Sequence, residues 1–294
     1  MNDAPQRLLV IGRSGQLARA LSEASPQAQR LGREAFDLAH DDPGDMLDEI
    51  KPALVINAAA YTAVDRAEDE PEAAMALNAA GPGRLAEACR RRAIALVHVS
   101  TDYVFDGAGG APYAEDAETN PLNTYGRTKL AGEHAVLNAH PGALVVRASW
   151  IFDAAGGSFL NAIFNRLDAG QPLSVVDDQI SAPTYAPDLA GALLTMAGAI
   201  TQNPTQGGGV FHYLGGPHAS WFEFASAAID RSGARFAGVK ITPVDSSAFP
   251  SPAARPKDTR LSADRIYERF GVHAGDWRIA ISAFLAQRYS DARD

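Results

Sequence analysis

Short apolar runs alternate, along the first half of the chain, with longer segments whose composition suits helices. The apolar runs occupy 7–11, 53–57, 95–100 and 143–147, and the helical segments occupy 16–24, 72–92 and 125–138. This alternation is typical of βαβ units, in which parallel strands form one sheet and helices cover both of its faces. The pattern predicts an α/β fold, a doubly wound parallel sheet.

In the second half of the chain, expected strands and helices alternate less regularly. Helices are expected at 159–169, 187–200, 221–231 and 277–289, and strands at 173–176 and 210–214. Four prolines fall within 243–258, a density that favours an irregular loop. We therefore expect a first domain over 1–150 and a smaller lobe over 151–294, with some later segments returning to the main sheet.

The charge balance limits the classes of partner that this chain can bind. Lys and Arg number 26 against 35 Asp and Glu, a net charge of −9, whereas nucleic-acid binding needs a basic surface. The single cysteine, Cys89, cannot form an internal disulfide, and the seven histidines show no metal-site spacing. Residues 1–6 lack a signal-peptide pattern, and no apolar run approaches a membrane span. We expect a cytoplasmic protein with no nucleic-acid or membrane partner and no metal site.

A glycine loop follows the first expected strand. The segment 12–18 reads GRSGQLA, which has the form GxxGxxA and opens the first helix. Glycines at this place allow a tight turn and let backbone N–H groups approach a pyrophosphate at the helix N-terminus. The loop predicts a Rossmann-type dinucleotide-binding domain over 1–150.

The second strand is expected to end near Leu31, and no acidic residue follows it at the place typical of NAD-selective sites. Arg13 and Arg33 are instead positioned to meet a 2′-phosphate. We therefore predict that NADPH is accepted, with NADH also open because Glu34 adjoins Arg33. Asp37 follows soon after, and it either accepts a hydrogen bond from the adenine amino group or is an exposed loop aspartate.

A second constellation combines a strand-end hydroxyl with YxxxK. Tyr125 and Lys129 are four residues apart, which places the phenol and the ammonium on one helix face. An adjacent ammonium favours the phenolate and lowers the pKa of a tyrosine, which makes it a usable general acid or base. Ser100 and Thr101 end the fourth strand, and either hydroxyl could bind the oxygen on which Tyr125 acts.

These elements, in this order, resemble the extended short-chain dehydrogenases/reductases and, within them, the dTDP-4-dehydrorhamnose reductase family. The resemblance covers nearly the whole chain and weakens after about residue 230. It rests on GQL at 15–17, VINAAAYTAVD at 55–65, VSTDYVFDG at 99–107, PLNTYGRTKLAGE at 121–133, RASW at 147–150 and DQISAPT at 178–184.

The resemblance implies NAD(P)H-dependent reduction of a dTDP-linked 4-keto-6-deoxy sugar, the last step of dTDP-L-rhamnose synthesis. Thr101, Tyr125 and Lys129 would be the catalytic trio, with Tyr125 giving a proton to the C4 oxygen. The implied cofactor-binding residues are Gly12, Arg13, Ser14, Gly15, Gln16, Leu17, Arg33, Asp37, Leu38, Ala60, Tyr61, Thr62 and Val99, together with Tyr125 and Lys129. The residues expected at the substrate are Thr101, Asp102, Tyr103, Trp150 and Arg255.

Several points stay open in the sequence. Trp150 is either a platform for a hexose or a core residue, and Arg147 is either a substrate clamp or a structural ion pair. Arg255 and Lys257 either hold the diphosphate or lie in a solvated loop. The resemblance leaves a magnesium requirement and a homodimer undecided. Two other functions remain: a nucleotide-sugar epimerase or dehydratase with tightly bound NAD, since Asp102 resembles a dehydratase acid, and a non-catalytic NADP-binding regulatory subunit.

Overall fold

The computed structural model describes residues 7–109, 112–203 and 207–290. Residues 1–6, on which the expectation of no signal peptide rests, lie outside this part. Within the described residues, no helix combines the length and the apolar character needed to cross a bilayer.

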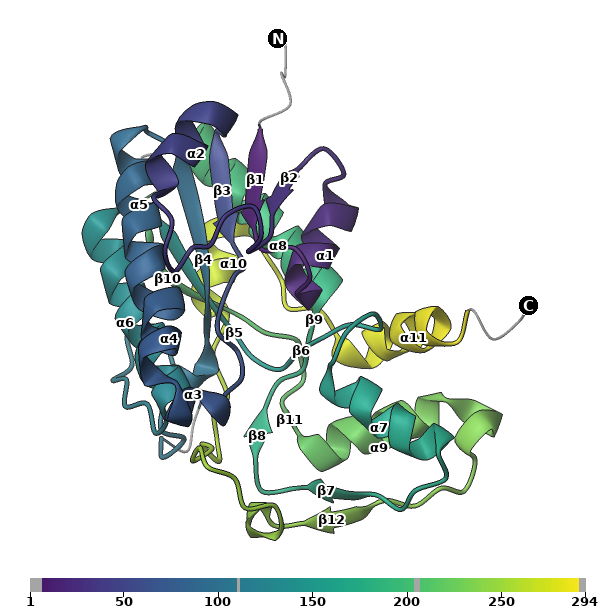
Figure 1. The fold of residues 1–294 in the computed structure, drawn as a ribbon. Coiled ribbons are helices and arrows are strands. Elements are labelled where there is room, and N and C mark those ends of the chain that lie inside the picture. Colours follow the sequence, from purple (N-terminus) through teal and green to yellow (C-terminus); the bar gives the residue numbers. More distant parts are fainter. Residues whose placement is uncertain (1–6, 110–111, 204–206, 291–294) are drawn as a thin grey trace.

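A six-stranded parallel sheet forms the centre of the molecule, which confirms the predicted fold class (Figure 1). Its strand order is β10-β5-β4-β3-β1-β2, so the chain runs from β1 outward to β2 and then restarts at β3 on the other side of β1. Ligands bind such sheets at the carboxyl ends of the strands, near the point where the order reverses. The strands are β1 (Leu8–Ile11), β2 (Gln29–Leu31), β3 (Leu54–Asn57), β4 (Ala95–Thr101), β5 (Leu144–Ala148) and β10 (Gly209–Tyr213).

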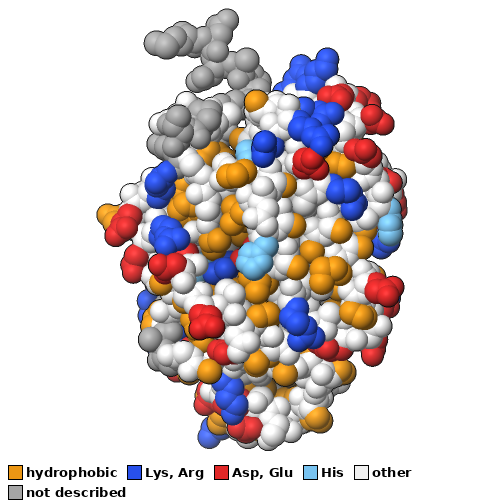
Figure 2. Space-filling model, turned by 90° about the vertical axis from the view of Figure 1, so that its left-hand side faces the viewer, with side chains coloured by type: hydrophobic (Ala, Val, Ile, Leu, Met, Phe, Trp, Pro, Cys, Tyr) orange, Lys and Arg blue, Asp and Glu red, His pale blue; other side chains and the backbone are white. Residues whose placement is uncertain are grey.

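Helices cover both faces of the sheet, as the buried strands require. α1 (Gln16–Ala24) packs on α8 (Ala186–Gln202) over one face. α2 (Pro43–Ile50), α5 (Gly81–Arg91) and α6 (Thr124–Ala139) cover the other. Acidic and basic side chains are interspersed on the side of the molecule that α5 and α6 form (Figure 2). The net charge of −9 therefore does not gather there in one patch.

The second lobe has its own apolar core, in which α7 (Phe159–Asp168), α9 (Trp221–Arg231) and α11 (Trp277–Arg288) pack together (Figure 1). β10, α8 and α10 (Asp264–Phe270) lie against the main sheet although they come late in the chain. The division at residue 150 itself stays a prediction. Three two-stranded sheets complete the lobe: β6 (Ile151–Phe152) with β9 (Thr184–Tyr185), β7 (Ser174–Val176) with β12 (Thr242–Val244), and β8 (Ile180–Ser181) with β11 (Ala219–Ser220).

The proline-rich stretch 243–258 differs in part from the expected irregular loop. Pro243 lies within β12, where it pairs with Val175. Both strands of a two-stranded sheet are edge strands. A proline is tolerated in such a strand because the side that faces away from the partner strand makes no ladder hydrogen bonds.

Two glycines let α6 approach its neighbours closely. A Cβ on Gly126 would lie 2.2 Å from the carbonyl oxygen of Tyr103, in the 3-10 turn η2 (Asp102–Val104). A Cβ on Gly132 would lie 2.0 Å from the carbonyl oxygen of Asn78, in the π-helical turn η1 (Ala76–Ala80). Only glycine fits at such distances, and the Gly126 contact places the first turn of α6 beside η2, which follows the carboxyl end of β4.

Candidate active site

Two cavities meet at the carboxyl edge of the sheet. One has a volume of about 530 Å³ and the other about 480 Å³. Both are lined by Ser14, Gly15, Ala58, Ala59, Ala60 and Thr62, so they form one continuous channel. The larger cavity is also lined by Gln16, Leu17, Val99, Ser100, Thr101, Asp102, Tyr103, Tyr125, Lys129 and Trp150. The smaller one is also lined by Gly12, Arg13, Arg33, Asp37, Leu38 and Tyr61. Every residue predicted at the cofactor or the substrate, except Arg255, therefore lies in this channel.

The glycine loop forms the join between the two cavities. Gly12 has a φ of +125°, a backbone conformation that favours glycine, and its N–H donates to the carbonyl of Leu31 at 2.8 Å. Gly15 precedes α1, whose N-terminus has neither a side-chain cap nor an acidic residue in its first turn. The N–H groups at the start of α1 and the positive end of its helix dipole can therefore bind an anion.

The smaller cavity forms one end of the channel, and its wall contains two arginines, Arg13 and Arg33. Arg33 is largely exposed, and its Nε lies 3.0 Å from the Asp37 carboxylate. Asp37 is therefore already paired with Arg33 and also accepts from the Ala39 N–H, so an adenine amino group would have to share it. Glu34, the residue that left NADH open, is exposed and does not line the cavity.

Lys129 is buried on α6, and its Nζ donates to the carbonyl oxygen of Val99 at 2.7 Å. Desolvation lowers the pKa of Lys129 to about 8, although the nearby Glu133 carboxylate acts in the opposite direction. The ammonium therefore loses its proton within a pH range that enzymes encounter.

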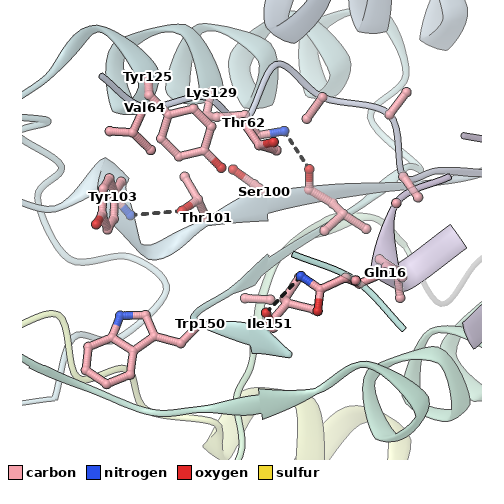
Figure 3. Close-up of a pocket in the computed structure, with 18 of the residues that line it drawn as sticks. Gln16, Thr62, Val64, Ser100, Thr101, Tyr103, Tyr125, Lys129, Trp150 and Ile151 are labelled. Atoms are coloured by element: carbon pink, nitrogen blue, oxygen red, sulfur yellow. Dashed lines mark hydrogen bonds between the residues drawn. The ribbon is translucent and has the colours of Figure 1, made fainter. Parts of the chain in front are cut away.

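Tyr125 lies one helical turn before Lys129 and faces the same cavity (Figure 3). Desolvation raises the pKa of Tyr125 to about 12, against a lowering by its hydrogen bond with Thr101. The prediction that Lys129 lowers the pKa of this phenol is wrong for the protein alone, because the loss of solvation dominates. A phenol with a raised pKa stays protonated at neutral pH, and it is also a weaker acid than a free tyrosine.

Thr101 and Ser100 differ in where their hydroxyls are engaged. Ser100 Oγ donates to a Glu133 oxygen at 2.5 Å, behind the cavity wall. Thr101 Oγ1 accepts from the Tyr103 N–H at 3.2 Å and donates to Asp102 at 3.1 Å. Ser100 and Thr101 both line the cavity that Tyr125 also lines, and Thr101 is the one whose hydroxyl is not bound to Glu133.

Asp102 is 2% exposed and accepts hydrogen bonds from two further hydroxyls, Thr259 at 2.5 Å and Ser181 at 3.2 Å. Burial raises the pKa of Asp102 to about 6, although these hydrogen bonds lower it. The carboxyl group is thus held firmly by residues from three separate parts of the chain.

Trp150 forms the opposite wall of the larger cavity (Figure 3). Its φ of +44° is unusual for a bulky residue, and its indole stacks on Trp221 with centroids 3.5 Å apart. The platform interpretation of Trp150 therefore fits better than the core interpretation.

Arg255 lies outside this cavity. It lines a neighbouring one of about 400 Å³ that shares Trp221 with the first. Its guanidinium donates to both oxygens of Asp65 at 2.7 and 2.9 Å. Lys257 is exposed and pairs with Asp178 at 3.0 Å.

Arg147 is a structural ion pair and not a substrate clamp. It is 3% exposed, its Nη2 lies 2.7 Å from Glu133 Oε2, and it is absent from the cavity wall. His98 is also buried, and its Nδ1 lies 3.0 Å from the amide nitrogen of Asn57.

Sequence reasoning missed two residues that shape the site. Asn78 is fully buried, bonds both backbone groups of Tyr61, and donates to Thr128 on α6 at 3.0 Å. An asparagine inside an Ala-rich helical stretch was the available signal. Trp221 lines both the larger cavity and its neighbour, and its place at a helix start gave no signal.

Comparisons with known proteins agree with this geometry. The family described as the RmlD substrate binding domain matches residues 6–290. A dTDP-4-dehydrorhamnose reductase of Mycolicibacterium smegmatis is 41% identical, covering 96% of this chain and 85% of the relative. One of Sinorhizobium fredii is 38% identical, covering 92% of this chain and 94% of the relative. The crystal structure of a dTDP-4-dehydrorhamnose reductase from Bacillus anthracis in complex with NADP superimposes with a TM-score of 0.87. It is 30% identical and covers 96% of this chain and 99% of that chain.

Proposed function

Because the chain belongs to the RmlD substrate binding domain family, we propose that it is an NAD(P)H-dependent oxidoreductase of the dTDP-4-dehydrorhamnose reductase type. It reduces dTDP-4-dehydro-β-L-rhamnose to dTDP-L-rhamnose, the last step of dTDP-L-rhamnose synthesis. One observation carries the proposal: a single channel joins the glycine loop to Thr101, Tyr125 and Lys129.

The channel fits NADPH. Gln16 Oε1 is buried in its wall without a hydrogen-bond partner, and the α1 N-terminus has no side-chain cap. Arg13 and Arg33 supply the charge that a 2′-phosphate needs. The NADP complex of the Bacillus anthracis relative supports this choice, and NADH as a second cofactor belongs to the proposal too.

The chain's own residues then perform the acid catalysis. NADPH, when bound, supplies a hydride from its nicotinamide to the sugar C4. Tyr125 gives its proton to the C4 oxygen, and Thr101 holds that oxygen beside the phenol. Lys129 holds the nicotinamide ribose hydroxyls. Asp102, Tyr103 and Trp150 surround the sugar.

We place the dTDP group in the neighbouring cavity of about 400 Å³. Its wall contains aromatic and aliphatic side chains, with Arg255 at the side that adjoins the larger cavity through Trp221. A thymine needs the apolar surface and a diphosphate needs the arginine. Arg255 is therefore proposed to hold the diphosphate while Asp65 fixes its orientation.

The test couples the upstream pathway enzymes to this protein and follows the loss of NADPH absorbance. We expect NADPH oxidation that depends on the dTDP-ketosugar. Oxidation with a different ketosugar alone would replace the substrate. Bound, non-exchanging NAD after purification would favour an epimerase or dehydratase, and co-purification with a methionine adenosyltransferase would favour a regulatory subunit. A cytoplasmic location stays a prediction, and a homodimer and a magnesium requirement stay open. Each needs a separate test.

A further inference from the structure

A buried ion pair lies directly behind the wall of the active site. Glu133 on α6 is 1% exposed and Arg147 on β5 is 3% exposed. Arg147 donates to both carboxylate oxygens of Glu133, with Nε–Oε1 at 2.9 Å and Nη2–Oε2 at 2.7 Å. Arg147 also lies over the ring of Phe105, and its Nη1 is 3.3 Å from His212 Nε2. Neither charged residue lines the cavity, so the proposed chemistry does not use them.

Glu133 is connected to residues of the active site in two ways. Its Oε1 accepts from Ser100, which does line the cavity. It also follows Lys129 by four residues on α6, as Lys129 follows Tyr125, so the three side chains share one helix face. A carboxylate one turn from a buried ammonium favours its charged form through space, because little solvent screens the interaction.

Among the described residues around Lys129, Glu133 is the carboxylate that raises the pKa of this ammonium. From β4, His98 faces it and stays neutral, because desolvation and Lys129 itself lower the pKa of that imidazole well below its usual value. Arg147, on β5, is positive and acts against Glu133. From η2, Asp102 lies on the Thr101 side of the cavity and Tyr103 packs against Tyr125. The η1 turn contributes the neutral Asn78, and Glu68 of α3 (Arg66–Asp69) bonds Thr124 at the far end of α6.

We propose that Glu133 is a positioning residue that keeps the buried Lys129 ammonium charged, while Arg147 and Ser100 fix the carboxylate in place. The inference rests on the proposed function, since it concerns how Lys129 holds the cofactor. Desolvation and Glu133 act on Lys129 in opposite directions, in agreement with this arrangement.

The test measures NADPH binding by fluorescence at several pH values between 7 and 10, with purified full-length protein. In the wild type, affinity should fall as pH rises through about 8, because Lys129 then loses its charge. Lys129→Met should remove this fall, which identifies the group that titrates. In Glu133→Gln the midpoint should move down by about one pH unit or more, the usual effect of losing an adjacent opposite charge.

Arg147→Gln is the matched control, because it breaks the same ion pair but removes the positive member. Its midpoint should move up, since Glu133 is then left to act on Lys129 alone. Both variants lose a buried pair and should lose similar stability, so a purely structural role predicts no shift or shifts of one sign. Opposite shifts therefore separate the two interpretations.

The double variant Glu133→Gln/Arg147→Leu leaves no unpaired buried charge and covers the case in which a single variant fails to fold. Its midpoint should lie below that of the wild type, because the carboxylate is the nearer charge. Equal midpoints in the wild type and the variants, or a wild-type affinity that is flat with pH, would overturn the role of Glu133. No binding of NADPH by the wild type would instead overturn the proposed function.

Discussion

The indole rings of Trp150 and Trp221 stack face to face, with centroids 3.5 Å apart and planes inclined by 10°. Trp150 follows β5 of the main sheet, whereas Trp221 begins α9 of the second lobe behind a Ser220 capping box. The stack therefore joins the half that holds the cofactor channel to the half that carries the neighbouring cavity. Because Trp221 lines both cavities, it borders both the proposed sugar position and the proposed nucleotide position.

Trp221→Ala should raise the KM for the dTDP-ketosugar by about tenfold, the upper range for losing one aromatic contact. The KM for NADPH should stay unchanged, because Trp221 does not line the adenosine end of the channel. Tyr267→Ala is a suitable control, since that ring is 52% exposed, lies tilted against His273 and lines neither cavity. Steady-state kinetics with each substrate varied in turn measure the effect. An unchanged sugar KM would show that Trp221 does not border the substrate.

Tyr125→Phe should lower kcat by about 10²–10⁴, the usual contribution of a positioned general acid. The substitution removes one hydroxyl and keeps the ring that packs edge-to-face on Tyr103. NADPH affinity should therefore remain, and fluorescence titration of the same preparation checks it. Full turnover in this variant would assign the proton donor to another group.

The sequence predicted the fold well because its signals are local. Apolar strands between helices are read from neighbouring residues, and the loop 12–18 and the Tyr125–Lys129 spacing are also local patterns. The contacts that complete the site join distant segments. Arg255 and Asp65 are 190 residues apart, and Trp150 meets Trp221 across two lobes. The high pKa of Tyr125 comes from desolvation, which spacing along a helix does not reveal.

Arg33→Ala should lower kcat/KM with NADPH by about tenfold, the order expected for losing one charge-assisted hydrogen bond. The value with NADH should change little, because that cofactor lacks the 2′-phosphate. Glu34→Ala is the matched control, since Glu34 is the adjacent exposed charge and does not line the channel. Initial rates with both cofactors give the two ratios. Equal efficiency of wild type and Arg33→Ala with NADPH would leave Arg13 as the arginine that meets the phosphate.

Asp102 should make the protein less stable as pH rises from about 4 to 6. Its pKa is raised from 3.8 to about 6 in the folded protein because the carboxyl group is buried. In this pH window the folded state retains a proton that the unfolded state has lost, so stability falls with rising pH and then levels off above about 6. Asp102→Asn cannot titrate, and the hydrogen bonds it alters cost the same at every pH. As pH rises across this window, the wild type should therefore lose up to about 3 kcal/mol of unfolding free energy relative to the variant.

Urea unfolding at pH 4.5, 5.5, 6.5 and 7.5 would measure this difference. Asp106→Asn, from the same loop, provides a control that should stay flat across these pH values. Hydrogen bonds from the Ala108 N–H and from Asn120 lower the pKa of Asp106 below 3.8, so its contribution to stability is fully present over this range and is lost only at lower pH. A difference between wild type and Asp102→Asn that stays flat across these pH values would mean that Asp102 titrates normally. The carboxyl group would then be solvated in the folded protein and not enclosed by Thr101, Ser181 and Thr259.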